Sequence, residues 1–419
     1  MHLWLVSFAA LAVALTGATA GTPPTFYKDV LPIIEQRCQE CHRPGEIAPM
    51  SLLSYADARP WAKSIREAVL NRKMPPWLAD SKYGHFANDR SLSQPEIDTL
   101  VNWVDGGVAK GDPRDAPAPR TWPPGWAIGR PDAVFEMPKP FPIPAKGAVD
   151  YQYIILPTHF PEDKWIQKVE VRPSDHRIVH HAVVYIREPG SKWLEGQPGS
   201  VAFSVPLSKG FTTSDILMVY TPGNSLDQWN PGMAKKIKAG SDLVLQMHYT
   251  ADGQAGMDRT RIGIVFAKEP PKLAILTLQM GNDKFLIPPE DPSYRVSVSG
   301  TLPNDALLIS LFPHMHLRGK SFEYSIARPN GNLETLLKIN KYDFNWQLNY
   351  RLSEPRLIPA GTRLLWTAYF DNSPNNPRNP DPEAEVRFGE QSWEEMMIGF
   401  FDVAVDAGID KAAFFLRQR

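Results

Sequence analysis

Helical periodicity dominates the chain between residues 25 and 110. Apolar side chains recur at three- and four-residue intervals in three stretches, near residues 26–34, 61–69 and 97–108. This spacing places the apolar side chains of each stretch on one face of a helix. Before the third stretch, Ser93 and Glu96 stand three positions apart, as in a capping box that begins a helix. We therefore expect residues 25–110 to be helical.

The pattern changes to short alternating runs after residue 125. Three such runs, rich in aliphatic and aromatic residues and bounded by Gly, Pro, Asp or Asn, cover residues 151–155, 243–250 and 307–311. Many short strands separated by turn residues are typical of β-sandwiches. About 300 residues follow the change, which is enough for two such domains. The Pro270–Pro271 pair is a plausible boundary between them.

These patterns predict a multidomain fold, with a small all-α domain followed by two all-β, jelly-roll-like sandwich domains. Between the two kinds of pattern, residues 111–125 contain five prolines and few aliphatic residues, which is typical of a semi-rigid linker. The expected division is a signal peptide at 1–20, an α domain at 21–110, the linker at 111–125, and sandwiches at 126–270 and 271–419.

The first residues have the form of a secretory signal. An apolar run from Leu3 to Leu15 ends in Ala18-Thr19-Ala20, and cleavage is expected before Gly21. An uncleaved membrane anchor is the alternative, but about 13 apolar residues fall short of the roughly 20 that span a bilayer. We expect a periplasmic or secreted protein with no stable membrane span after cleavage. The formal net charge of −1 does not favour binding to nucleic acid.

The two cysteines of the chain lie in one motif. Cys38, Cys41 and His42 form C-x-x-C-H, the pattern of covalent c-type haem attachment. A thioredoxin-like pair would need a βαβ setting, and a zinc site would need a second Cys/His pair nearby, so both are less favoured. Met74, on a proline-rich loop, is the expected sixth ligand, and Met50 is the competitor. Residues 25–110 thus resemble a small class I cytochrome c domain with one haem.

Histidines gather in the predicted β region. His180 and His181 are adjacent, His248 ends an alternating strand, and His314 and His316 are two positions apart. A strand period of two places His314 and His316 on one face, whereas an adjacent pair needs a bulge, a strand end or different ring nitrogens to share one ion. Each histidine alone is better explained as structural. Together they indicate an imidazole-rich metal site, and a nearby thioether would suit copper.

Four motifs occur in a fixed order along the chain: Val179-His180-His181-Ala182, Leu245-Gln246-Met247-His248-Tyr249, His314-Met315-His316-Leu317-x-Gly319-Lys320 and Glu395-Met396. This order resembles that of the copper type II, ascorbate-dependent monooxygenases, the family of peptidylglycine α-hydroxylating monooxygenase and dopamine β-monooxygenase. The likeness covers roughly residues 130–415. It implies two β-sandwich domains, each holding one copper ion, on either side of a solvent cleft.

The resemblance also implies the ligands of the two copper ions. The electron-transfer copper would be held by His180, His181 and His248. The oxygen-activating copper would be held by His314, His316 and Met396, with Met397 as the alternative if the alignment is displaced by one residue.

Departures from the family pattern bear on the substrate. Phe312 stands where peptide-amidating members hold a carboxylate with arginine, and Ile398 and Phe400 replace polar partners. We therefore expect a monooxygenase that hydroxylates a small apolar or aromatic substrate with O2, using electrons that an external donor supplies through the haem. The alternatives are a haem–copper electron-transfer or copper-binding protein without hydroxylase activity and, less favoured, a binding module with structural histidines.

Overall fold

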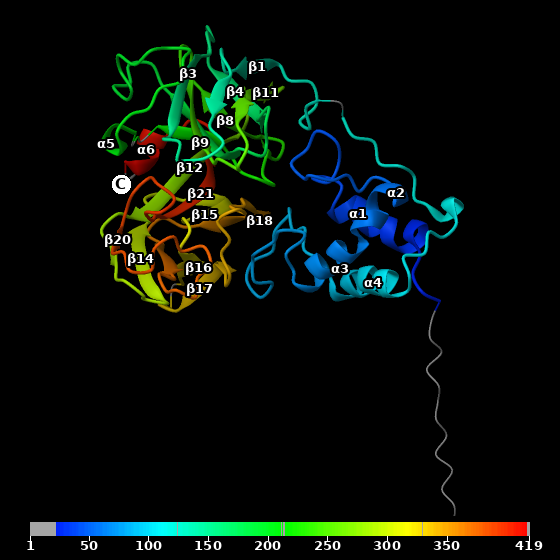
Figure 1. Cartoon of the computed structure of the whole chain (residues 1–419). Helices are drawn as coiled ribbons and strands as arrows, with labels where there is room; N and C mark the ends of the chain where they lie inside the picture. Colours follow the sequence, from blue (N-terminus) through cyan, green and yellow to red (C-terminus); the bar gives the residue numbers. More distant parts are fainter. Residues whose placement is uncertain (1–21, 124, 211, 213, 329, 417–419) are drawn as a thin grey trace, which may run out of the picture.

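The computed structural model describes residues 22–123, 125–210, 212, 214–328 and 330–416 (Figure 1). The expected signal peptide at 1–20 lies outside these residues. The described chain is mostly β-sheet with few helices, as β-sandwich domains require. Most of its helical elements lie before residue 116, which Figure 1 shows in blue and cyan beside the β-rich remainder.

The helical segment consists of short elements. They are η1 (Phe26–Val30), α1 (Leu31–Arg37), α2 (Tyr55–Ala58), η2 (Arg59–Trp61), α3 (Ala62–Leu70), α4 (Gln94–Asp105) and η3 (Pro113–Asp115). The capping box predicted at Ser93 and Glu96 is confirmed, since each side chain accepts the other residue's backbone N–H. Trp103, rather than Val104, is buried on α4, and Trp61, expected on a buried face, is 42% exposed.

The strands after the linker divide into two successive sets. The first comprises β1 (Ala133–Glu136), β2 (Phe141–Ile143), β3 (Gln152–Pro157), β4 (Lys164–Arg172), β5 (Val179–Arg187), β6 (Asp215–Tyr220), β7 (Leu226–Gln228), β8 (Met233–Ile237), β9 (Asp242–Tyr249), β10 (Gly256–Asp258) and β11 (Arg261–Phe266), with the short helix α5 (Leu207–Gly210). These strands include the predicted runs at 151–155 and 243–250.

The second set completes the chain. It comprises β12 (Leu273–Asn282), β13 (Leu286–Ile287), β14 (Tyr294–Thr301), β15 (Ala306–His314), β16 (Gly319–Ala327), β17 (Leu333–Ile339), β18 (Tyr350–Ile358), β19 (Arg363–Phe370), β20 (Val386–Arg387) and β21 (Met397–Asp406), followed by the helix α6 (Lys411–Phe415). The run predicted at 307–311 lies within β15.

One nine-stranded sheet runs through both sets. Its order is β1-β11-β4-β8-β12-β21-β15-β18, with β7 paired to β4. The four-stranded sheet β3-β9-β5-β6 shares a hydrophobic core with the first half of this sheet, and β14-β19-β16-β17 shares another with the second half. Two sandwich-like halves are therefore joined by a continuous sheet, and the β8–β12 pairing is the seam between them.

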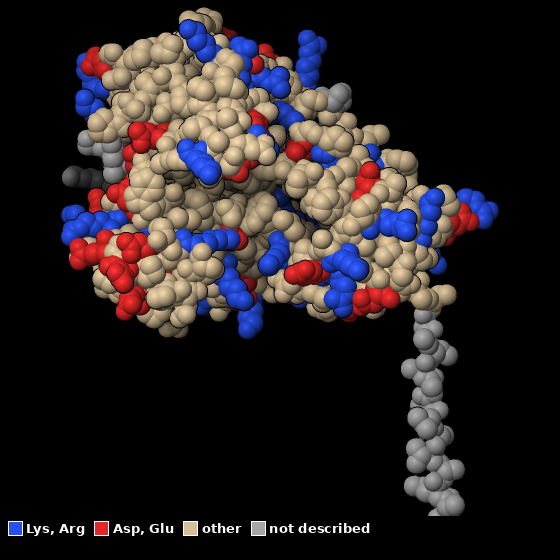
Figure 2. Space-filling view, viewed as in Figure 1, with Lys and Arg blue, Asp and Glu red and all other residues tan. Residues whose placement is uncertain are grey.

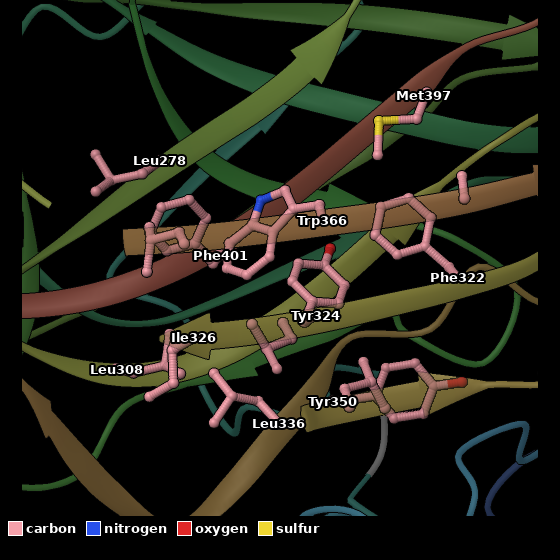
Figure 3. Close-up of a cluster of buried hydrophobic side chains, with 14 of the residues drawn as sticks. Leu278, Leu308, Phe322, Tyr324, Ile326, Leu336, Tyr350, Trp366, Met397 and Phe401 are labelled. Atoms are coloured by element: carbon pink, nitrogen blue, oxygen red, sulfur yellow. The ribbon is translucent and has the colours of Figure 1, made fainter. Parts of the chain in front are cut away.

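Large side chains fill the second of the two cores. Trp366 and Tyr324 have ring centroids 4.5 Å apart, and Met397 and Phe401 from β21 lie in the same cluster (Figure 3). Burial of these aromatic side chains is the main source of stability here, because each removes a large apolar area from water. Met397 is therefore part of the hydrophobic core.

A buried lysine reinforces the seam. The parallel pairing of β8 with β12 covers only two residue pairs, but Lys235 of β8 is 1% exposed and donates hydrogen bonds to Ile216 O and the Thr277 hydroxyl. Its Nζ lies 3.7 Å from a carboxylate oxygen of Asp402 on β21. A buried ammonium group requires such partners, so this network holds the two halves in register.

The helical segment is attached to the second half by the residues that follow α3. The strip between residues 77 and 90, which we call the docking strip, forms isolated bridges from Ala79 to Ile339 and from Phe86 to Leu352. Trp77 packs edge-on against Tyr350, with ring centroids 4.9 Å apart. Figure 1 shows this strip as the blue segment that reaches β18. The helical segment is thus fixed by direct packing as well as by the linker.

No helix in the described part of the chain is long and apolar enough to cross a membrane. Lys and Arg side chains are interspersed with Asp and Glu over the face shown in Figure 2.

Asp227, near the seam, should make stability depend on pH. Burial, followed by the charge of Asp402, raises its pKa to about 6 from a usual value of 3.8. The folded chain therefore binds more protons than the unfolded chain between about pH 4 and 6, and this group makes stability fall as pH rises through that window. We expect Asp227→Asn to raise the free energy of unfolding above pH 6 by on the order of 2 kcal/mol, with no gain near pH 4.

Urea unfolding at pH 4 and pH 7.5 measures the effect. Asp402→Asn is a companion variant, because it removes both an anionic partner of Lys235 and one cause of the raised pKa of Asp227, and it should lower stability at pH 7.5. If Asp227→Asn raised the free energy of unfolding equally at both pH values, the raised pKa of Asp227 would not be the cause of the pH dependence.

Candidate metal centre

Three histidines from two paired strands converge in the first half. His180 and His181 lie on β5, and His248 lies opposite His181 on β9. A register shift between Val179 and His181 places a bulge at His180, which lets adjacent residues turn toward the same point. The Nδ1 atoms of His180 and His181 are 3.0 Å apart, and those of His181 and His248 are 3.4 Å apart. The three residues form a group that could hold a metal ion.

The outer contacts of these rings determine which nitrogen is free. The Nε2 atom of His180 lies 3.1 Å from the carbonyl oxygen of Phe344, so it must carry the proton and donate it, which leaves a lone pair on Nδ1. The Nε2 atom of His181 lies 3.2 Å from the Tyr151 hydroxyl. Burial lowers the pKa of His180 to about 4, so the ring is neutral at pH 7, as a ligand must be.

The two close pairs of Nδ1 atoms, which share His181, fit a metal ion. An ion placed between nitrogens 3.0–3.4 Å apart lies about 2.0 Å from each, the usual length of a metal–imidazole bond. Without a cation, each of these close nitrogen pairs needs one ring to donate an N–H to the other.

A second pair of histidines lies at the end of β15. His314 is the last residue of the strand and His316 lies just beyond it, so regular strand alternation ends at the first of the two. Their ring centroids are nevertheless 5.1 Å apart. The Nδ1 atom of His314 donates to Gln347 Oε1 at 2.6 Å, and that of His316 donates to Glu394 O at 3.3 Å. Both Nε2 atoms therefore keep their lone pairs, and His316 Nε2 is buried with no hydrogen-bond partner among the described residues.

Glu395 links this pair to the methionine motif. Its carboxylate is fully buried and accepts the backbone N–H groups of His316, at 2.9 Å, and of Arg318, at 2.6 Å. The next residue, Met396, lies beside the cavity that His314 also lines. Met397 points the other way, into the core shown in Figure 3. Of the two candidate thioethers, Met396 is therefore the one that the fold brings toward the histidine pair.

The two histidine groups adjoin each other. The ring centroids of His181 and His314 are 5.7 Å apart, so the five rings form one contiguous cluster. The two groups are therefore in direct contact here, and a cavity lined by residues of both halves opens beside them. The reason is the continuous central sheet, which brings the end of β15 against β5.

A loop that the sequence reasoning missed lies between the two groups. Residues 341–349, which we call the bridging loop, connect β17 to β18. Phe344 stacks on His180 with ring centroids 4.1 Å apart and meets His316 edge-on at 6.2 Å. Gln347 bonds His314 and also donates to Phe344 O. The available signal was the run of aromatic and amide residues in Tyr342–Asn349, which is unusual for a solvent-exposed connection.

A cavity of about 710 Å³ opens beside the cluster. His181, His314 and Met396 form part of its wall, and the apolar side chains expected to contact substrate are also there, namely Phe312, Ile398 and Phe400. The volume falls within the range of small-molecule sites. The wall also holds Glu390, whose pKa burial raises to about 7, with the Glu394 charge adding to the effect.

The haem motif lies in the helical segment, away from the histidine cluster. Burial raises the pKa of Cys38 to about 12 and also raises that of Cys41, which is the reverse of what a reactive redox pair requires. His42 Nδ1 donates to the carbonyl oxygen of Met50 at 3.3 Å, which leaves Nε2 free to bind iron. Met50 is therefore held next to His42 through its backbone carbonyl. The partly buried Met74 has no such constraint.

Comparisons with known proteins add little to this geometry. No family model matches the sequence, and no curated protein matches it. Among solved structures, the major capsid protein P2 from bacteriophage PM2 is similar at 9% identity, over 66% of this chain and 98% of that chain, with a TM-score of 0.30. The infectious bursal disease virus VP2 subviral particle is similar at 10% identity, over 67% and 73%, with a TM-score of 0.20. Likenesses this weak carry no argument about function.

Gln347 should act on metal affinity through His314. Replacement by leucine removes the acceptor that fixes the His314 ring, and loss of such an outer contact typically weakens metal binding by about 10- to 100-fold. We expect Gln347→Leu to lower copper affinity at the His314 side by this amount, measured by competition with a calibrated chelator. Gln167→Leu is the control, because it removes amide hydrogen bonds to Trp229 O far from the cluster. If Gln347→Leu and Gln167→Leu bound copper with equal affinity, Gln347 would have no role in orienting His314.

Proposed function

We propose that this protein is a copper-dependent monooxygenase that hydroxylates a C–H bond of a small, predominantly apolar substrate with O2. The observation that carries the proposal is the placement of five buried histidines, with unprotonated ring nitrogens available, at the wall of a substrate-sized cavity. The order of the histidine and methionine motifs, which resembles that of the copper type II monooxygenases, supports it.

The residues present fit two copper ions. His180, His181 and His248 offer three imidazole nitrogens, and His314, His316 and Met396 offer two imidazoles and a thioether. Imidazole and thioether ligands suit copper, and the softer set favours Cu(I). When bound, copper activates dioxygen at one site and stores an electron at the other. The orphaned Nε2 of His316 and the converging Nδ1 atoms are the features that a bound ion would satisfy.

The chain itself would position the substrate and exclude water. Phe312 and Phe400, with ring centroids 5.8 Å apart, form an apolar surface next to His314. Such a surface orients an apolar C–H group toward the histidines without binding a carboxylate, and it keeps water from the reacting atoms. An electron-transfer protein has no need of such a cavity beside its ligands, which disfavours the main alternative.

We further propose that the helical segment is a small cytochrome c domain with one covalent haem. Cys38 and Cys41 would form the thioether bonds, His42 would be the proximal ligand and Met74 the sixth ligand. When bound, the haem carries single electrons from an external donor. A periplasmic or secreted location, expected from the N-terminal signal, would allow haem attachment. The linker at 111–125 and the sandwiches at 126–270 and 271–419 complete the proposed domain plan.

Metal content and oxygen consumption test the main proposal. Protein matured in an oxidising compartment should contain one haem and two copper ions, and Met396→Ala should lose or weaken one copper. Met397→Ala should keep both ions and lose stability instead, because its side chain fills the core. A screen of apolar and aromatic compounds should reveal substrate-dependent O2 consumption with a hydroxylated product. Copper content that is indifferent to Met396 would overturn the proposal.

The sixth haem ligand can be tested separately. A thioether ligand raises the reduction potential of a c-type haem, so Met74→Ala should lower the potential and abolish the weak absorption band that reports methionine ligation. Met50→Ala is the matched control and should leave both properties near their original values. The reverse pattern would assign Met50 as the ligand.

A further inference from the structure

The bridging loop also contacts the haem-motif side of the molecule. Its last residue, Asn349, accepts a hydrogen bond at its carbonyl oxygen from Asn88 Nδ2 of the docking strip, at 2.6 Å. The Asn88 side-chain oxygen accepts the backbone N–H of Arg351 at 3.0 Å. The loop that holds His180 and His314 is therefore tied, within a few residues, to the helical segment.

The docking strip continues to the haem motif itself. Asp89 accepts a hydrogen bond at its carbonyl oxygen, at 3.4 Å, from Arg37, the residue before Cys38. The path from the cysteines to the strip is therefore short.

Arg90 meets the bridging loop beside Gly223. A Cβ atom at Gly223 would lie 3.3 Å from Arg90 Nη1, 3.5 Å from Leu348 Cδ2 and 3.9 Å from Trp346 Cζ3. Gly223 also has φ +82°, where a side chain is strained, so the backbone can approach this junction closely. Trp346 thus lies next to Gly223, which lines the same cavity as Cys41, and the next residue, Gln347, bonds His314.

We propose that the bridging loop is the electron route from the haem to the copper cluster, entering at Trp346 and leaving through Gln347 to His314. The inference rests on the proposed function. With both groups bound, each transfer would move one electron, taking the haem iron from Fe(II) to Fe(III) and one copper from Cu(II) to Cu(I), with no bond or proton exchanged. Two transfers supply the two electrons that one hydroxylation consumes.

A competing route would pass through the first half. Cys41, His176 and Tyr220 line a second cavity, of about 260 Å³, between the helical segment and the first half. Tyr220 pairs with Ala182, the neighbour of His181. This route reaches His181 only through the backbone pairing of Tyr220 with Ala182, whereas Trp346 and Gln347 are covalently joined and Gln347 hydrogen-bonds the His314 ring directly. The bridging loop is therefore the more direct connection to a ligand side chain.

Kinetics of haem oxidation test the route. A photoreductant reduces the haem of the anaerobic, Cu(II)-loaded protein, and decay of the ferrous absorption band reports electron transfer to copper. In the wild type the decay should be independent of protein concentration. Trp346→Leu should slow it by on the order of tenfold or more, because the connection between the haem side and Gln347 is weakened. Trp346→Phe, which keeps an aromatic ring, should restore most of the rate.

Two controls make the result specific. Trp61→Leu changes an exposed tryptophan of the helical segment and should leave the rate unchanged, and haem and copper contents identify any variant that fails to fold. A variant Tyr220→Leu that slows transfer while Trp346→Leu does not would overturn the proposed route.

The same experiment separates this inference from the proposed function. If the ferrous band of the copper-loaded wild type does not decay, the supply of electrons through the haem fails as a whole. If it decays equally fast in the wild type and in Trp346→Leu, only the route is wrong.

Discussion

The seam between β8 and β12 is the constraint on which the rest of the structure depends. Two residue pairs of parallel backbone pairing would be weak alone, and the buried ammonium group of Lys235 adds partners from β6, β12 and β21. Because a buried charge that loses its partners costs several kcal/mol, the seam admits little sliding. The two sandwich-like halves thus share one sheet, and the histidines of each half are brought together.

The candidate metal centre depends on a second kind of constraint, the outer hydrogen bonds of its rings. His180 is oriented by Phe344 O, His314 by Gln347 and His316 by Glu394 O. Each bond takes one ring nitrogen as a donor and leaves the other as a lone pair. Because burial keeps these rings neutral, the cluster can bind a cation without first releasing protons. The bridging loop supplies two of these three bonds, so ligand orientation in both halves depends on one connection.

That dependence also relates the cluster to the helical segment. The docking strip between residues 77 and 90 holds the far side of the bridging loop through Asn88 and packs Trp77 and Phe86 into the second core. A segment that carries the haem motif and a loop that orients metal ligands therefore share one packed interface. This arrangement gives a physical reason for joining the two modules in one chain, since their relative position is set by burial and not by the linker alone.

Much of the fold and of the candidate site could be predicted where the signal was local. The capping box at Ser93 and Glu96, the strands near 151–155, 243–250 and 307–311, and the residue types of the ligand motifs all rest on spacing along a few residues. The bulge at His180 was one of three ways to make adjacent histidines converge, and the sequence left that choice open. Trp61 was misplaced because periodicity identifies a face and cannot tell whether another element covers it.

The sequence by itself determined which metal-binding side chains are present. Two thiols and an imidazole lie within five residues, and imidazoles and thioethers occupy strand positions that allow them to bind metal. Covalent connectivity limits how far apart such neighbours can lie, so their spacing is already informative. Only the tertiary structure decided that Met396 faces the cavity while Met397 fills the core, that His181 and His314 adjoin, and that Gln347 orients His314. These relations join residues tens to hundreds of positions apart, and they arise from the packing of whole sheets, which no local pattern encodes.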